Sequence, residues 1–130
     1  MSTKHILAID DDQPILQLLR SVGEACGVSV TATSDPEKFL SELKDNPPDL
    51  LFLDLVMPQF DGIEVLRTLA ADGVEAKIIL ISGAENDLLE RAQALAIAWG
   101  LNVIGAVAKP LDALNIRDRV LEATKDEEPG

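Results

Sequence analysis

Five short apolar runs, each followed by a stretch with helical spacing, restrict the fold of this chain more than any other feature. The runs are residues 6–9, 28–33, 50–53, 77–81 and 103–107. This alternation is typical of βα units arranged around a parallel sheet. Several runs are almost continuously apolar, as expected of strands covered on both faces. We therefore predict an α/β fold in which residues 28–33, which alternate more, form an edge strand and the other four runs lie centrally.

The stretches between the runs carry the start and stop signals of helices. Pro14 precedes an i, i+3, i+4, i+7 apolar stripe, where a first-turn proline is tolerated. Ser34 stands three residues before Glu37, which predicts a capping box for the second helix, and that helix must end before Pro47. The sequence thus predicts where the first two helices begin.

The later helices and the chain end follow the same kind of signal. The third and fourth predicted helices end at Gly73 and Gly100, and the fifth follows Pro110. The chain has 130 residues, which fits one domain. We expect this domain to span residues 1–124, with the polar residues 125–130 as a tail or the start of a linker.

Composition excludes several classes of function. The formal net charge is −12, so the chain is repelled by nucleic acid and anionic lipid. The longest apolar run, residues 94–99, is far shorter than the roughly 20 residues of a membrane span. One cysteine and one histidine exclude a disulfide within the chain and a thiolate or histidine metal cluster. We expect a cytoplasmic protein that binds neither nucleic acid nor membrane.

Polar residues stand at the carboxyl ends of four of the five predicted strands. They are Asp10, Asp11 and Asp12 after the first strand, Asp54 after the third, Ser82 after the fourth and Lys109 after the fifth. Ligands of open parallel sheets bind at this edge. Clustered carboxylates repel one another, and a hard cation such as Mg²⁺ compensates them. A cation, a lysine and a hydroxyl around Asp54 would suit phosphoryl transfer to that carboxylate.

Each of these residues also has a plain structural interpretation. The aspartate run is common in solvated turns with a helix N-cap, a role that suits Asp12. Asp54 can simply terminate a strand, Ser82 can belong to a turn, and Lys109 can lead into a helix that Pro110 opens. Because residues that suit one reaction occur together at four strand ends, we favour the interpretation as a phosphoryl-transfer site.

With these residues in place, the chain resembles the receiver domains of two-component response regulators over nearly its whole length. The matching stretches are Ile6-Leu7-Ala8-Ile9-Asp10-Asp11-Asp12, Leu51-Phe52-Leu53-Asp54-Leu55-Val56-Met57-Pro58 with Asp61-Gly62, Ile79-Leu80-Ile81-Ser82-Gly83 and Ala108-Lys109-Pro110. The resemblance implies a flavodoxin-like, doubly wound sheet of five parallel strands in the order 2-1-3-4-5, with five helices.

The resemblance also implies roles for these residues. Asp54 would be the phosphoacceptor, with Ser82 as the hydroxyl and Lys109 as the phosphate-pairing lysine. Asp10, Asp11, Asp54 and the backbone carbonyl of Val56 would bind Mg²⁺. Implied partners are a sensor histidine kinase or phosphotransfer protein, an output domain or effector, and a homodimer that forms on phosphorylation. The domain would be a regulatory phosphoacceptor and not an enzyme.

The sequence departs from the family at a few positions. Ala106 stands where an aromatic residue usually acts as a switch, which moves the expected signal route to the segment after Ser82. Val56 and Ala84 are apolar where the family orients a hydrolytic water, so we expect slow self-dephosphorylation. The spacing from Ser82 to Lys109 predicts a longer fourth helix, and the run 100–110 is similar to receivers fused to cyclic-di-GMP phosphodiesterase domains.

Rival functions differ in specific residues. A haloacid-dehalogenase-like phosphatase would need a second acid two residues after Asp54, where this chain has Val56. A flavin or nucleotide binder would need a phosphate loop after the first strand, where Asp10–Asp12 would repel the ligand. A non-phosphorylated pseudo-receiver typically lacks one of the site residues, and here all are present.

Overall fold

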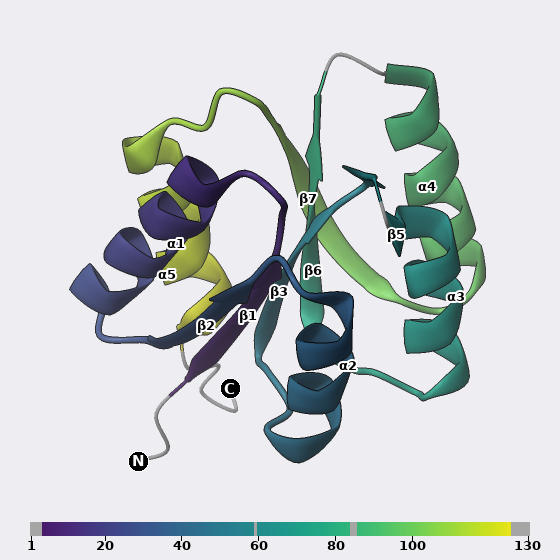
Figure 1. Cartoon of the computed structure of the whole chain (residues 1–130), viewed down its shortest axis with the longest axis horizontal. Coiled ribbons are helices and arrows are strands. Elements are labelled where there is room, and N and C mark those ends of the chain that lie inside the picture. Colours follow the sequence, from purple (N-terminus) through teal and green to yellow (C-terminus); the bar gives the residue numbers. More distant parts are fainter. Residues whose placement is uncertain (1–3, 59, 84–85, 126–130) are drawn as a thin grey trace, which may run out of the picture.

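The computed structural model describes residues 4–58, 60–83 and 86–125, and its elements alternate along the chain as predicted (Figure 1). The strands are β1 (His5–Ile9), β2 (Ser29–Thr33), β3 (Leu50–Asp54), β4 (Val56–Met57), β5 (Phe60–Asp61), β6 (Lys77–Ser82) and β7 (Asn102–Ala108). The helices are α1 (Gln13–Ala25), α2 (Pro36–Asp45), α3 (Gly62–Ala71), α4 (Asn86–Ala98) and α5 (Ala113–Thr124).

Five parallel strands form one sheet in the order β2-β1-β3-β6-β7. This order is the predicted 2-1-3-4-5 arrangement, so the flavodoxin-like fold is confirmed. Each strand lies within one residue of its predicted run. The reason is that buried parallel strands consist of uninterrupted apolar side chains, which stand out from the amphipathic helices.

Helices cover both faces of the sheet (Figure 1): α1 and α5 lie on one face, and α2, α3 and α4 on the other. Because successive side chains of a strand alternate between faces, β1 and β3 supply both cores. Phe52 is fully buried beneath α1 and α5, and Phe39 is fully buried on the other side. The two cores hold the strands rigidly, and the strands fix the positions of the residues at their carboxyl ends.

The prediction that residues 103–107 lie centrally is wrong. An open sheet has two edge strands, and here they are β2 and β7. The strand β7 is only partly covered, and Ile104 is 43% exposed. Its apolar, uncharged sequence resembles that of a central strand, so composition alone misplaced it. The register between β6 and β7 also shifts by one residue at Ile104, because Ile78 pairs with Val103 and Ile79 with Gly105.

The capping box predicted at Ser34 is also wrong. The N-cap of α2 is Asp35, whose Oδ1 accepts a hydrogen bond from the Glu37 backbone N–H at 2.9 Å. A carboxylate one residue nearer the helix reaches the N2 amide directly, and it therefore replaces the serine. Asp12 stands at the N-cap of α1 as expected but makes no side-chain capping bond.

A short antiparallel hairpin, β4 and β5, was not predicted. Val56 pairs with Asp61 and Met57 with Phe60, directly after Asp54 and directly before α3. Strands of two residues are too short to show any periodicity, so the sequence pattern contains no sign of them. The hairpin holds the chain segment that follows Asp54 against the start of α3.

Candidate functional site

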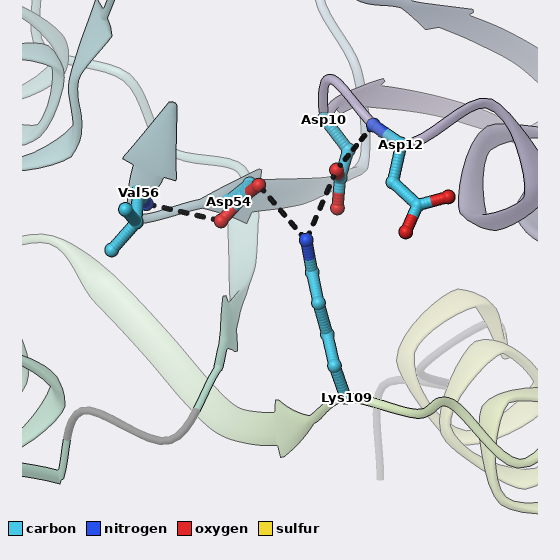
Figure 2. Close-up of polar contacts among 5 residues, drawn as sticks. All are labelled: Asp10, Asp12, Asp54, Val56 and Lys109. Atoms are coloured by element: carbon cyan, nitrogen blue, oxygen red, sulfur yellow. Dashed lines mark hydrogen bonds and ion pairs between the residues drawn. The ribbon is translucent and has the colours of Figure 1, made fainter. Parts of the chain in front are cut away.

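The predicted site residues lie at the carboxyl ends of four parallel strands, and Figure 2 shows Asp10, Asp54 and Lys109 meeting there. Asp10 follows β1, Asp54 ends β3, Ser82 ends β6 and Lys109 follows β7. Asp10, Asp54 and Ser82 are almost wholly buried, while Asp11 is exposed. Because the sheet order places β3 between β1 and β6, Asp54 stands at the centre of the group.

Lys109 reaches across the site from the far edge of the sheet. Its Nζ lies 3.3 Å from Asp10 Oδ1 and 3.2 Å from Asp54 Oδ2, and it therefore pairs with both buried carboxylates. The Lys109 side chain keeps about a quarter of its surface exposed. The lysine supplies the positive charge that two buried acids require.

Backbone N–H groups fix the two carboxylates. The Asp12 N–H donates to Asp10 Oδ1 at 2.9 Å, and the Val56 N–H donates to Asp54 Oδ1 at 3.0 Å (Figure 2). Asp10 Oδ2 is buried and has no hydrogen-bond partner within the described residues. A buried carboxylate oxygen without a partner is costly, which points to a ligand that the protein is built to accept.

Burial and the closeness of two carboxylates disfavour the ionised form of Asp10. Burial, with the neighbouring Asp54 carboxylate adding to it, raises the pKa of Asp10 from 3.8 to about 7. Burial pulls the pKa of Lys109 downward, but the Asp10 and Asp54 carboxylates outweigh it and raise that pKa above 10.5. The lysine is therefore charged at neutral pH, while burial favours the protonated form of Asp10 far more than in an exposed aspartate.

The carboxylates of Asp10, Asp11 and Asp54 fit a metal ion. One oxygen from each lies within 4.8 Å of the others. Carboxylates that leave room for water suit Mg²⁺, and the unpartnered Asp10 oxygen gives the cation a buried ligand already in place. This cluster could hold a divalent cation.

The other two predicted site residues differ in burial, because Val56 is exposed and Ser82 is buried. Val56 is 52% exposed and lies in β4, two residues beyond Asp54. Ser82 pairs with Ala108 across the sheet, and its carbonyl accepts a hydrogen bond from the Lys109 N–H at 2.9 Å. This bond ties the ends of β6 and β7 together beside the site. Ala84, whose apolar side chain entered the prediction of slow dephosphorylation, lies outside the described residues.

Gly62 is a residue whose contribution the motif alone did not explain. A Cβ on Gly62 would lie 2.8 Å from Leu55 Cα and 2.9 Å from the Leu55 carbonyl oxygen. Only glycine lets the first turn of α3 approach the peptide that follows Asp54 so closely. No periodicity of the sequence reports such a contact, because it forms between segments brought together by the β4–β5 hairpin.

The fold and the site agree with a family comparison. A family model described as the response regulator receiver domain matches residues 6–121, so the chain belongs to this family. Such domains are regulatory elements of two-component systems, in which signals pass by phosphorylation. Within the described residues, no helix combines the length and apolar character needed to cross a membrane.

Individual relatives are similar over most of the chain. The regulatory protein VirG of Rhizobium rhizogenes is 32% identical over 95% of this chain and 49% of its own length. The response regulator MprA of Mycobacterium leprae is 36% identical over 70% of this chain and 40% of its own length. The chain thus spans half or less of the length of these relatives.

Solved structures show the same fold. A response regulator from Colwellia psychrerythraea is 37% identical, with a TM-score of 0.81 over 93% of this chain and 96% of that chain. A signal receiver domain from Bermanella marisrubri is 25% identical, with a TM-score of 0.80 over 95% of this chain and 100% of the other.

Proposed function

We propose that this domain accepts a phosphoryl group on Asp54 in a reaction that requires Mg²⁺. The observation that carries the proposal is the arrangement of Asp54, a buried carboxylate that Lys109 contacts on one oxygen and that shares this lysine and a possible metal site with Asp10. A carboxylate nucleophile needs neighbouring positive charge that stabilises the phosphoryl oxygens as the bond forms. The nucleophile, Asp54, and the positive charge of Lys109 are thus close together.

Each residue has a part in the proposed transfer. An Asp54 oxygen attacks the phosphorus of a phosphohistidine or a small acyl phosphate, the O–P bond forms, and the donor leaves with the electrons of its own bond to phosphorus. Lys109 pairs with the transferred group, and the Ser82 hydroxyl donates to it. Bound Mg²⁺, held by Asp10, Asp11, Asp54 and the Val56 carbonyl, would neutralise charge on the phosphoryl oxygens.

The proposed donor is a sensor histidine kinase or phosphotransfer protein, and the proposed receiver of the signal is an output domain or effector. The relatives support this division, since one of them, PhoP of Bacillus subtilis, is named a transcriptional regulatory protein and extends well beyond the matched part. A fused cyclic-di-GMP phosphodiesterase domain is an output that the run 100–110 suggests.

Intact mass measurement tests the proposal. Incubation with acetyl phosphate and Mg²⁺ should add one phosphoryl group to the wild-type chain, and none when the metal is chelated. Asp54→Asn should remain unmodified because its amide is a poor nucleophile. Asp72→Asn, an exposed aspartate at the C-cap of α3, is the matched control and should be modified normally.

Two results would contradict the proposal. A single added phosphoryl group on Asp54→Asn would show that another residue accepts it. An unmodified wild-type chain, tested with both acetyl phosphate and a phosphorylated histidine kinase, would favour the pseudo-receiver alternative.

A further inference from the structure

The amino-terminal edge of the sheet, opposite the site of Asp54, carries an open hollow of about 1470 Å³. Its lining includes Lys4 before β1, Asp49 before β3, Lys77 at the start of β6 and Asn102 at the start of β7. The ends of α2 and α3 lie at the same end of the molecule, the lower end in Figure 1. The length of the strands thus separates this hollow from the acidic cluster.

Lysines gather in this hollow although the chain is strongly acidic, with 23 acidic and 11 basic residues. Four lysines and three acids line it, so the balance of charge is reversed there. The lysines come from four separate segments, whereas two of the acids follow α3 directly. These residues are Lys4, Lys44, Lys77 and Lys125, and Asp49, Asp72 and Glu75. A surface of this kind attracts carboxylates.

The charged groups of the hollow are held in different ways. Lys77 Nζ donates to the Ala123 carbonyl at 3.0 Å, which fixes it beside the last turn of α5. Asp49 Oδ2 accepts a hydrogen bond from the His5 N–H at 2.8 Å, so this acid already has a backbone partner. Lys44 is exposed, and its side chain has no hydrogen bond or ion pair among the residues that the structure describes. Positive charge therefore lies close to the point where the chain leaves α5.

We propose that residues 126–130 of this chain bind in the hollow, with their carboxylates against its lysines. These residues lie outside the described part of the chain, and their sequence is Asp-Glu-Glu-Pro-Gly. Lys125, the last described residue, itself lines the hollow, so the segment starts at the wall of its binding site. Five residues span at most about 18 Å, and the three acids are the first of them.

The covalent connection favours this segment over a separate acidic peptide. A short tether gives the segment an effective concentration on the order of millimolar, which a free peptide would have to match. Exposed ion pairs each contribute little, so a weak contact of this kind depends on the tether and on the number of charges. The bound segment would direct any chain that follows residue 130 away from Asp54. This contact does not depend on phosphorylation.

Carbodiimide cross-linking of the unphosphorylated chain tests the proposal. The reagent activates a carboxylate, a lysine amine in contact with it forms an amide, and the activated oxygen leaves as part of a urea. Mass spectrometry should find the carboxylates of residues 126–128 joined to Lys44 or Lys4. Lys38, exposed on the same helix as Lys44 but outside the hollow, is the matched control and should give a several times lower yield.

Two results of this experiment would overturn the proposal. Equal yields at Lys38 and Lys44 would show that residues 126–128 contact the surface without preference for the hollow. In a mixture of ¹⁵N-labelled and unlabelled chain, cross-links that join a labelled to an unlabelled copy would make the occupant a second copy of the chain.

Amide NMR of the same chain gives an independent test. The variant Asp126→Asn/Glu127→Gln/Glu128→Gln removes the three carboxylates of the segment and should shift the amide signals of Lys44 and Asn102, which line the hollow. Unchanged signals of these two residues would contradict the proposal.

A control variant separates local contact from the general effect of charge. Glu24→Gln/Glu90→Gln/Asp118→Asn also removes three carboxylates, all exposed and none of them in the lining of the hollow. It should leave the signals of Lys44 and Asn102 where they are in wild type. Equal shifts in both variants would show that the signals report net charge and not binding, and would overturn the proposal.

Discussion

Asp10 is the residue on which the electrostatics of the site depend most. Its carboxylate is completely buried, one oxygen has no hydrogen-bond partner among the residues that the structure describes, and its pKa is raised to about 7, first by burial and then by Asp54. A cation and a proton therefore compete for the same group. The affinity for Mg²⁺ should rise as the pH increases through 7.

The raised pKa of Asp10 also predicts that the free energy of unfolding depends on pH. Between pH 3.8 and about 7 the folded chain holds a proton on Asp10 that the unfolded chain has released, so the contribution of Asp10 to stability falls as the pH rises across this range and is lost above about 7. Asp10→Asn removes this titration. In denaturant unfolding without metal, the variant should gain on the order of 2 kcal/mol over wild type between pH 5 and pH 8.

Saturating Mg²⁺ provides the control. The metal binds the folded wild-type site and stabilises it, so the advantage of Asp10→Asn at pH 8 should shrink or reverse. An equal difference between variant and wild type at both pH values, without metal, would show that Asp10 does not titrate in this range.

At the scale of elements, the α2 cap offers a direct comparison of two adjacent residues. Asp35→Ala removes the bond to the Glu37 N–H and should lower the free energy of unfolding by about 1 kcal/mol. Ser34→Ala should change it by less than about 0.5 kcal/mol, because the serine is exposed and makes no capping bond to α2. Urea unfolding of both variants measures the difference. A larger loss in the free energy of unfolding for Ser34→Ala than for Asp35→Ala would support a capping box at Ser34.

The same elements show how far the sequence determines the fold and the site. Apolar runs such as residues 50–53 located the strands, and the polar residues after them located the acidic cluster, because strand ends meet at one edge of a parallel sheet. Interactions that depend on a single turn, such as the Asp35 cap, were not distinguishable from the neighbouring alternative. The edge position of β7 depends on which strands neighbour it, a property that its own composition does not encode.

At the scale of the whole molecule, the question is how a change at Asp54 reaches a distant surface. Ala106, which packs partly buried on the α3–α4 side of the sheet, has no side-chain torsion to rotate. Ser82 instead leads directly toward α4, which rests on the core through the small, fully buried Ala92 and Ala96. Helices that contact through small residues can shift with little steric cost.

Amide exchange tests this route. Phosphorylation of the wild-type chain should change exchange mainly between Gly83 and Gly100, with Trp99 fluorescence as a second reporter. Trp99 lies near the end of this segment, where the Arg67 guanidinium carbon is 5.6 Å from its ring centre. Asp54→Asn treated identically should show no change. Changes confined to β7 and α5 would show that the signal passes through these elements and not through α4, and would contradict the prediction.

The register shift at Ile104 has a consequence for how the protein behaves among other chains. The strand β7 is seven residues long, without charge or proline, and lies at an open edge of the sheet. Such a strand is a template for aggregation, because its outer backbone groups can pair with any extended peptide. The extra residue at Ile104 interrupts the regular ladder that an intruding strand would have to match. On the other edge, in β2, the Ala32 carbonyl accepts a hydrogen bond from the Arg20 guanidinium at 2.9 Å. Both edges of the five-stranded sheet thus carry a feature that disfavours the addition of a further strand.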